Sequence, residues 1–182
     1  MWLYVLIGTS ALLLIYIVVA FNSFIRLSNK VKEAFATMDV YLKKRWDLIP
    51  AIVETVKGYA QHEKDTFEKV TNLRNTVYHQ MSSNGRIDIN EQLTAGISKI
   101  MVIAENYPDL KANQNFLDLS SQLSKIENDI ANSRKYYNAV VRNMNTKVQL
   151  FPSNIVAGLF GFKEMKMFEA SESERQTVNV KL

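Results

Sequence analysis

Residues 2–25 read WLYVLIGTSALLLIYIVVAFNSFI, and no side chain in this stretch is charged. As an α-helix with a rise of about 1.5 Å per residue, the stretch would measure roughly 36 Å, enough to cross a bilayer core of about 30 Å. Trp2 and Tyr4 lie at one end, where amphipathic rings favour the membrane interface. The sequence therefore predicts a transmembrane anchor over residues 1–25, in contact with membrane lipid through residues 2–25.

A cleaved secretory signal peptide is the alternative interpretation of this segment, because Val18-Val19-Ala20 has the small-residue character of a cleavage site. No basic residue precedes the apolar run, however, and the run exceeds the length of a usual signal-peptide core. We therefore favour an anchor that is retained in the mature protein.

The basic residues that follow the anchor predict its orientation. Six of them fall within twenty residues of its end, and none precedes it: Arg26, Lys30, Lys32, Lys43, Lys44 and Arg45. Under the positive-inside rule this places the N-terminus outside and the bulk of the chain in the cytoplasm. The chain is expected to cross the membrane once.

The composition excludes several classes of protein. The 182 residues carry 22 basic and 18 acidic side chains, a net charge of +4, which gives little support to nucleic-acid binding. The chain has no cysteine, so disulfide frameworks, thiol nucleophiles and cysteine-ligated metal centres are excluded.

Apolar residues repeat at helical spacing beyond the anchor. One series has a seven-residue interval, and a second occupies the complementary position: Phe35, Leu42, Ile49, Val56, Val70 and Val77, then Met38, Ile52, Tyr59 and Leu73. Pro50 lies within this stripe and removes one backbone hydrogen bond, to the carbonyl of Trp46. Because the stripe keeps its phase across Pro50, we predict a single kinked helix of about 45 residues rather than two antiparallel helices.

Two further helices are predicted after a polar connection at residues 82–86. Asp88 and Glu91 have capping-box spacing and would begin a helix that ends near Ala104. After Tyr107-Pro108-Asp109, a third helix is expected from about Lys111 to Leu150. Its apolar face would comprise Phe116, Leu119, Leu123, Ile126, Ile130, Tyr137, Val140, Val141, Met144 and Val148.

The predicted fold class is therefore all-α, with a single N-terminal transmembrane helix that continues into a long antiparallel helical bundle. The expected divisions are an anchor at 1–25, a helical bundle at 26–162 and a polar C-terminal tail at 163–182.

The pattern offers no catalytic site. His62-Glu63 begins like a zinc-protease motif, but the second ligand position holds Thr66, and neither His62 nor His79 has the partner that a di-iron bundle needs. Asp47 and Glu54 lie seven residues apart on one helix, and a hydrolase that uses this pair is the least favoured hypothesis. We expect no enzyme activity, no cofactor and no metal.

Two segments are candidate interaction surfaces. Lys43, Lys44, Arg45 and Trp46 place three cations and an aromatic ring beyond the anchor, too far for screened attraction to lipid if the helix is straight. The default interpretation is a solvated basic face; as an interaction surface, they fit a partner-binding or inter-subunit face better than contact with lipid headgroups.

The second candidate surface runs from Phe151 to Phe162. It contains Phe151, Ile155, Val156, Leu159, Phe160 and Phe162, more large apolar side chains than one bundle end needs. The alternatives are a cap on the bundle core, a subunit contact and a membrane-dipping segment. We predict that Phe160 and Phe162 meet a neighbouring subunit or the bilayer, with Gly158 and Gly161 permitting close approach.

Motifs along nearly the whole chain resemble the LemA family. They are Arg45 to Pro50, Val53 to Ala60, His62 to Lys64, Tyr107 to Asn113 with Phe116, Arg134 to Asn138, Val141, Asn145 and Phe151 to Phe162. Trp46 and Ala51 depart from the family pattern, where tyrosine and asparagine are expected.

The resemblance implies a bacterial protein with one N-terminal helix and a long helical bundle, without established catalytic residues or cofactor. Because family members often accompany membrane proteases, it also implies by association an adaptor or scaffold role. Our first hypothesis is a scaffold that forms a homo-oligomer. The second is an adaptor or sensor subunit that regulates another membrane protein, such as a membrane protease.

Overall fold

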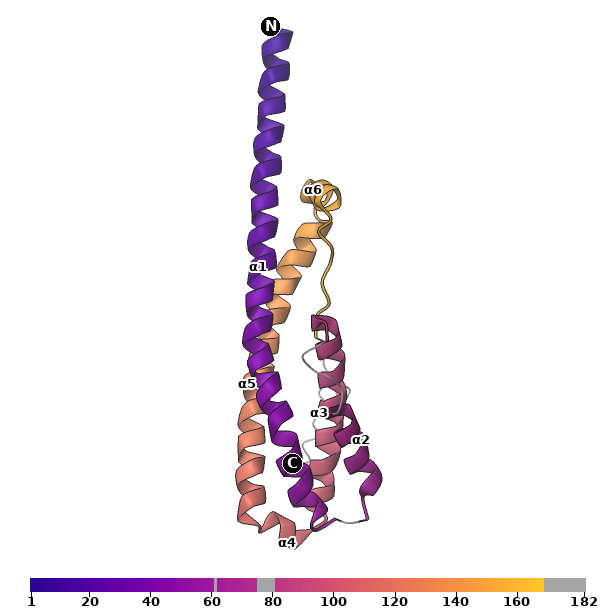
Figure 1. Cartoon of the computed structure of the whole chain (residues 1–182). Coiled ribbons are helices and arrows are strands. Elements are labelled where there is room, and N and C mark those ends of the chain that lie inside the picture. The colour runs from indigo at the N-terminus through magenta and orange to yellow at the C-terminus, as the bar shows by residue number, and fades with distance from the viewer. Residues whose placement is uncertain (61, 75–80, 169–182) are drawn as a thin grey trace, which may run out of the picture. The chain divides into compact units, whose positions relative to one another are not determined.

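The computed structural model describes residues 1–60, 62–74 and 81–168, and every regular element in these ranges is a helix. In chain order they are α1 (Trp2–Lys57), α2 (Lys64–Arg74), α3 (Ser83–Glu105), α4 (Pro108–Lys111), α5 (Gln114–Gln149) and α6 (Ser153–Phe160) (Figure 1). The predicted fold class is confirmed: the chain is all-α, with one N-terminal apolar helix that continues into a helical bundle.

Helix α1 is uninterrupted for 56 residues and contains Pro50. Leu42, Ile49 and Val56 lie on this one helix, each at most 2% exposed. The prediction that the helix continues past Pro50 is therefore confirmed. The most apolar window of α1 has a mean hydropathy of 2.5 and is only 6% buried by the rest of the chain, as expected for a membrane-spanning segment.

The predicted length of this helix beyond Pro50 is wrong, because α1 ends at Lys57 and a separate helix, α2, begins at Lys64. Gly58 follows the last helical residue, and glycine costs about 1 kcal/mol relative to alanine inside a helix. Asp65 in the first turn of α2 favours a helix start. Val70 is buried, but on α2, so its phase in the stripe was coincidental; Val77 lies outside the described residues.

The start of the next helix also differs from the prediction. Ser82, not Asp88, is the N-cap of α3, and its hydroxyl oxygen accepts a hydrogen bond of 3.2 Å from the amide of Gly85. The residues after Ser82 that were predicted to connect two helices therefore form the first turn of α3. The third predicted helix is preceded by the short helix α4, which has Pro108 at its first position, so α5 begins at Gln114.

The contacts divide the chain into two compact units. The first, which we call the anchor unit, comprises residues 1–37 and 133–167. Within it Phe35 packs edge-on against the ring of Tyr137, with ring centroids 5.9 Å apart. The side chain of Asn145 holds the extended residue Met165 by two bonds, accepting from its amide (2.8 Å) and donating to its carbonyl (2.9 Å).

The second unit, which we call the bundle unit, contains residues 38–132. After α1 ends, α2 runs back beside its last turns, and α3 runs antiparallel to α2 (Figure 1). The core includes these large apolar side chains, each at most 5% exposed: Met38, Leu42, Ile49, Ile52, Val56, Phe67, Val70, Ile87, Leu93, Ile97, Ile100, Leu110, Phe116, Leu123 and Ile130. Most of the α1 and α5 members belong to the predicted stripes, whereas Tyr59 is 40% exposed.

The predicted division into an anchor, a bundle and a tail stays a prediction. Of the tail, residues 163–168 are described and form no helix, although Met165 and Lys166 are bonded to α5. The remainder of the tail and His79 lie outside the described residues.

Candidate functional site

Helix α6 carries a cluster of exposed apolar side chains. Ile155 and Leu159 are 62% and 71% exposed and lie four residues apart, on one face of α6, and Phe151, in the turn just before the helix, is 79% exposed. Phe160 beside them is 46% exposed. We call these four residues the α6 apolar surface. The opposite face of α6 is buried through Val156 and Ala157.

The two ends of α6 are shaped by local chemistry. At its start the Ser153 hydroxyl lies 2.7 Å from the Lys147 carbonyl and 2.9 Å from the Leu150 carbonyl, so it satisfies backbone acceptors at the end of α5. At its end Gly161 has a φ of 75°, a left-handed conformation that glycine adopts without penalty. The amide of Phe162 then donates to the Ala157 carbonyl (2.9 Å), and the chain turns back.

This turn brings Phe162 onto the transmembrane helix. Its ring stacks on that of Phe24, with centroids 4.7 Å apart and an interplanar angle of 15°. Phe160 lies 4.8 Å from Phe21. The prediction that Phe160 and Phe162 meet a neighbouring subunit or the bilayer stays a prediction. Within the chain, Phe162 is half-buried against α1, while Phe151, Ile155 and Leu159 are the outward members. A Cβ atom at Gly158 would meet nothing within 4 Å, so that glycine permits no close approach inside the chain.

A cationic cluster lies next to this aromatic contact. The ammonium group of Lys147 donates to the Ser23 hydroxyl and sits 5.0 Å from the centroid of the Phe24 ring. Burial, and then the nearby Arg26, lower the pKa of Lys147 below its ordinary value. Sequence reasoning missed these contacts, because nothing in the local pattern of residues 20–26 indicates that α5 and α6 pack there.

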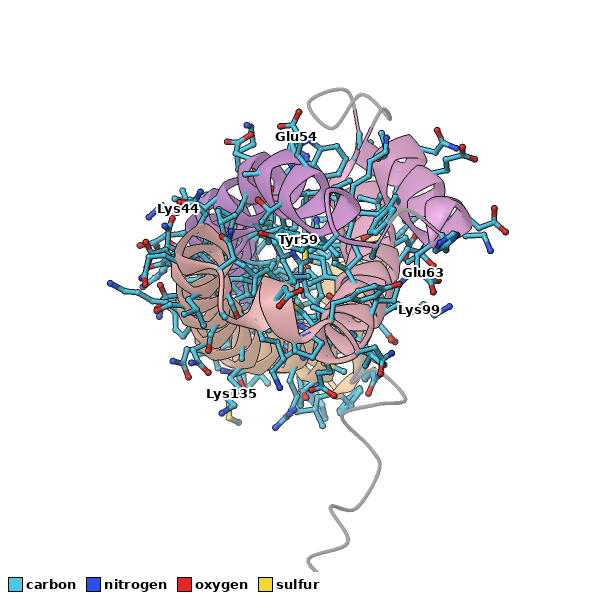
Figure 2. The ribbon with its side chains drawn as sticks, turned by 90° about the horizontal axis from the view of Figure 1, so that it is seen from below. Lys44, Glu54, Tyr59, Glu63, Lys99 and Lys135 are labelled. Carbon is cyan, nitrogen blue, oxygen red and sulfur yellow. The ribbon has the colours of Figure 1, made fainter. Side chains whose placement is uncertain are left out.

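The basic segment of α1 is divided between surface and interior. Lys43 and Lys44 are on the surface: Lys43 pairs with Asp47, and Lys44 lies 5.3 Å above the ring of Tyr41. Figure 2 shows Lys44 and Glu54 pointing outward from α1. We call the exposed positions that recur at three- and four-residue intervals the outer face of α1; they are Val40, Lys44, Asp47, Ala51 and Glu54.

Arg45 and Trp46 lie inside the bundle unit, which corrects their assignment to a solvated or partner-binding surface. They are 1% and 6% exposed. Both sit within one helical turn of Leu42 and Ile49, so the apolar stripe itself was the signal that these two residues point inward.

The Arg45 guanidinium joins three helices of the bundle unit. One terminal nitrogen donates to the Thr94 hydroxyl (2.8 Å) and to both carboxylate oxygens of Glu127 (3.0 and 3.2 Å). The other donates to the backbone carbonyl and side-chain oxygen of Asn90, at 2.9 and 2.7 Å. A second ion pair, Arg86 with Asp39 at 2.6 Å, also connects α3 to α1. These contacts fix the register of α1, α3 and α5, which is a structural role.

The residues considered for catalysis are not assembled into a site. Asp47 and Glu54 are both exposed on the outer face of α1, two turns apart, and Asp47 is paired with Lys43. His62 is exposed. Among the described residues no group of three or more metal-ligating side chains converges. The structure therefore offers no positive indication of catalysis in the part of the chain that it describes.

Comparison with known proteins assigns the family. The sequence profile of the LemA family matches residues 34–182, most of the chain. The chain belongs to the LemA family. Protein LemA of Metamycoplasma hominis is 26% identical over 159 residues, which cover 87% of this chain and 73% of that protein.

More distant relatives of this LemA-family chain carry another name. Magnetosome protein MamQ 2 of Paramagnetospirillum magneticum is 21% identical over 175 residues, and magnetosome protein MamQ of Magnetospirillum gryphiswaldense is 19% identical over 176. The alignments cover 82% and 81% of this chain but only 64% of either relative. Together with the apolar helix α1, the family and these relatives indicate a membrane-associated protein.

Proposed function

We propose that this protein is a non-enzymatic, membrane-anchored helical scaffold that self-assembles at the bacterial inner membrane. The observation that carries the proposal is α1 itself. One helix contains both the membrane-length apolar segment and the core stripe of the bundle unit, without a loop in which an anchor could be separated from a domain. A continuous helix is a direct way to attach a folded surface to a membrane.

The proposed orientation places the helical bundle in the cytoplasm. Basic residues follow the apolar segment closely, beginning with Arg26, Lys30 and Lys32, and positively charged flanks are retained on the cytoplasmic side. Protease added to intact spheroplasts should leave residues 26–182 uncut. Digestion of that region by the external protease, with the cell membrane shown to be sealed, would indicate the opposite orientation.

The outer face of α1 supports self-association. It combines the aliphatic side chains of Val40, which is 54% exposed, and Ala51 with Lys44, Asp47 and Glu54. A helix face that mixes small apolar residues with charges of both signs can pair with the same face of a second copy, as the flanking positions of coiled coils do.

The absence of cysteine makes this proposal testable by cross-linking. Ala51→Cys places a single thiol on the outer face of α1, and Ala95→Cys places one on an exposed position of α3 as the matched control. We expect a bifunctional maleimide to join two copies in membranes through Ala51→Cys and not through Ala95→Cys. Equal or absent cross-linking at the two positions would contradict contact through this face.

The alternative function is that of an adaptor or sensor subunit for another membrane protein, such as a membrane protease. Co-expression of two differently tagged full-length copies separates the two hypotheses. If the protein is a self-assembling scaffold, purification through one tag should also recover the copy that bears the other tag. If instead a single copy co-purifies with a different membrane protein in a fixed stoichiometry, the adaptor hypothesis is favoured.

A further inference from the structure

We infer that α6 is an interfacial membrane helix, whose apolar surface enters the bilayer beside the end of the transmembrane segment. The inference rests on the proposed membrane anchoring and adds to it a second, in-plane contact. The occupant of the α6 apolar surface is lipid, not a second copy of the chain. Three features of the anchor unit support it: the depth of α6 along α1, the composition of its exposed face and the charges that flank it.

The depth follows from the contact between Phe160 and Phe21, whose rings are 4.8 Å apart. Phe21 precedes Arg26, the first charged residue, by five positions, or about 7.5 Å along the helix axis. Interfacial helices bury their apolar faces about 5–10 Å into the boundary between headgroups and acyl chains. Phe160 therefore meets α1 at the depth that an interfacial helix occupies.

The exposed face of α6 has the composition that this depth requires. Phe151, Ile155 and Leu159 point away from the chain, while Val156 and Ala157 face inward. The segment from Val148 to Phe162 contains no charged residue. A short helix with exposed aromatic and aliphatic side chains and no ionic group suits an acyl environment better than water.

Cations flank this uncharged segment on both sides. Lys147 precedes it and Lys163 follows it, and Lys147 is close enough to Arg26 for the two charges to interact. Basic side chains at the boundary of a membrane-inserted segment pair with phosphate headgroups, above all those of anionic lipids. Arg26 and Lys147 thus lie close to one end of the uncharged segment, and Lys163, followed by Glu164, lies at the other, with basic charges suited to the headgroup layer.

Continuity with the transmembrane segment favours lipid over a second copy as the occupant. Val18 and Val19, within a turn of Phe21, are 57% and 59% exposed, and in a spanning helix they face acyl chains. Because Phe160 contacts Phe21 at the end of this lipid-facing segment, the same medium can cover the α6 apolar surface.

The test measures the surroundings of single residues in the full-length chain, reconstituted in vesicles of phosphatidylethanolamine and phosphatidylglycerol. Because the chain has no cysteine, Leu159→Cys can be spin-labelled alone. Leu13→Cys, at a position 61% exposed on α1, is the transmembrane reference, and Tyr136→Cys, at a position 54% exposed on α5, is the aqueous one. Oxygen collects in acyl chains and a nickel chelate stays in water, so their relative collision rates with each label report its medium.

We expect the label at position 159 to collide with oxygen at least several-fold more than with the chelate, as at position 13 and opposite to position 136. A water-like profile at 159 with a lipid profile at 13 would overturn the inference and leave the anchoring intact. Low collision rates with both reagents, together with dipolar broadening between labels, would instead show a second copy on α6 and also overturn it. A water-like profile at 13 would overturn the anchoring itself.

Discussion

Replacement of Arg45 by methionine tests whether the buried guanidinium holds α1, α3 and α5 of the bundle unit together. Arg45→Met keeps most of the aliphatic stem but removes the donors that reach Thr94, Glu127 and Asn90. Asn90 is 2% exposed, so its side-chain oxygen would lose a partner that water cannot easily replace.

The expected cost follows from what remains after the change. Loss of one partner of a buried ion pair costs about 3–5 kcal/mol. The Glu127 side chain is 34% exposed and can be rehydrated, which places the cost at the lower end, about 3 kcal/mol. Glu127→Met leaves the Arg45 guanidinium, which is 1% exposed, without its counter-charge, so we expect at least as large a cost for it, about 3–5 kcal/mol. The double variant should cost less than the sum of the two, because the pair is already broken by either change.

Urea unfolding of the full-length chain in detergent micelles, followed by circular dichroism, measures these differences. The matched control is Lys43→Met, which breaks an exposed pair whose side chains are 37% and 56% accessible and should cost at most about 0.5 kcal/mol. If Arg45→Met proved no more costly than Lys43→Met, or if the two single changes were strictly additive, the network would not hold the unit together.

Three further predictions concern packing and protonation. Gly96→Ala would place a Cβ atom 2.7 Å from Val70 Cγ2, and in the same unfolding assay it should cost about 1–3 kcal/mol. Val70→Ala removes a buried side chain and is costly by itself, but in that background Gly96→Ala should cost less than in the unchanged chain; an equal cost in both would contradict the clash with Val70. Burial raises the pKa of Tyr137 above its ordinary 10.0, so the folded chain holds the phenolic proton more tightly than the unfolded chain. Stability should therefore be unaffected by this group below about pH 10 and fall as the pH rises through the raised value, and Tyr137→Phe should lessen that fall. Phe162→Ser, which loses the stacking on Phe24, should lower the thermal midpoint in micelles clearly more than Leu159→Ser, whose side chain is 71% exposed; equal effects would contradict the assigned packing.

The sequence predicted the helices well wherever hydrophobic periodicity was the deciding force. The stripe through Leu42, Ile49 and Val56 gave the continuity of α1 past Pro50, because one missing backbone bond is outweighed by an uninterrupted buried face. The same reasoning failed at Gly58, because the apolar face of α2 happened to continue the heptad phase of α1. Hydrophobic periodicity indicates which side of a helix is buried, but it does not indicate whether the chain reverses direction between two helices.

The candidate surfaces were harder to predict, since they depend on contacts between residues distant in sequence. Lys43, Lys44 and Arg45 look alike as three consecutive cations, yet only Arg45 meets Glu127, which is 82 positions away. Phe162 and Leu159 are equally apolar, but the left-handed Gly161 turns only Phe162 onto Phe24. Composition identified the segment from Phe151 to Phe162 as unusual, whereas the division between packed and exposed members required the fold.

The most direct test of the proposed scaffold is a cryo-EM reconstruction of the full-length protein extracted from bacterial membranes in lipid nanodiscs. We predict particles that contain several copies of this chain, with their transmembrane segments in one bilayer and their bundle units on one side of it. Particles that contain one copy, alone or beside a single different membrane protein, would contradict the self-assembling scaffold.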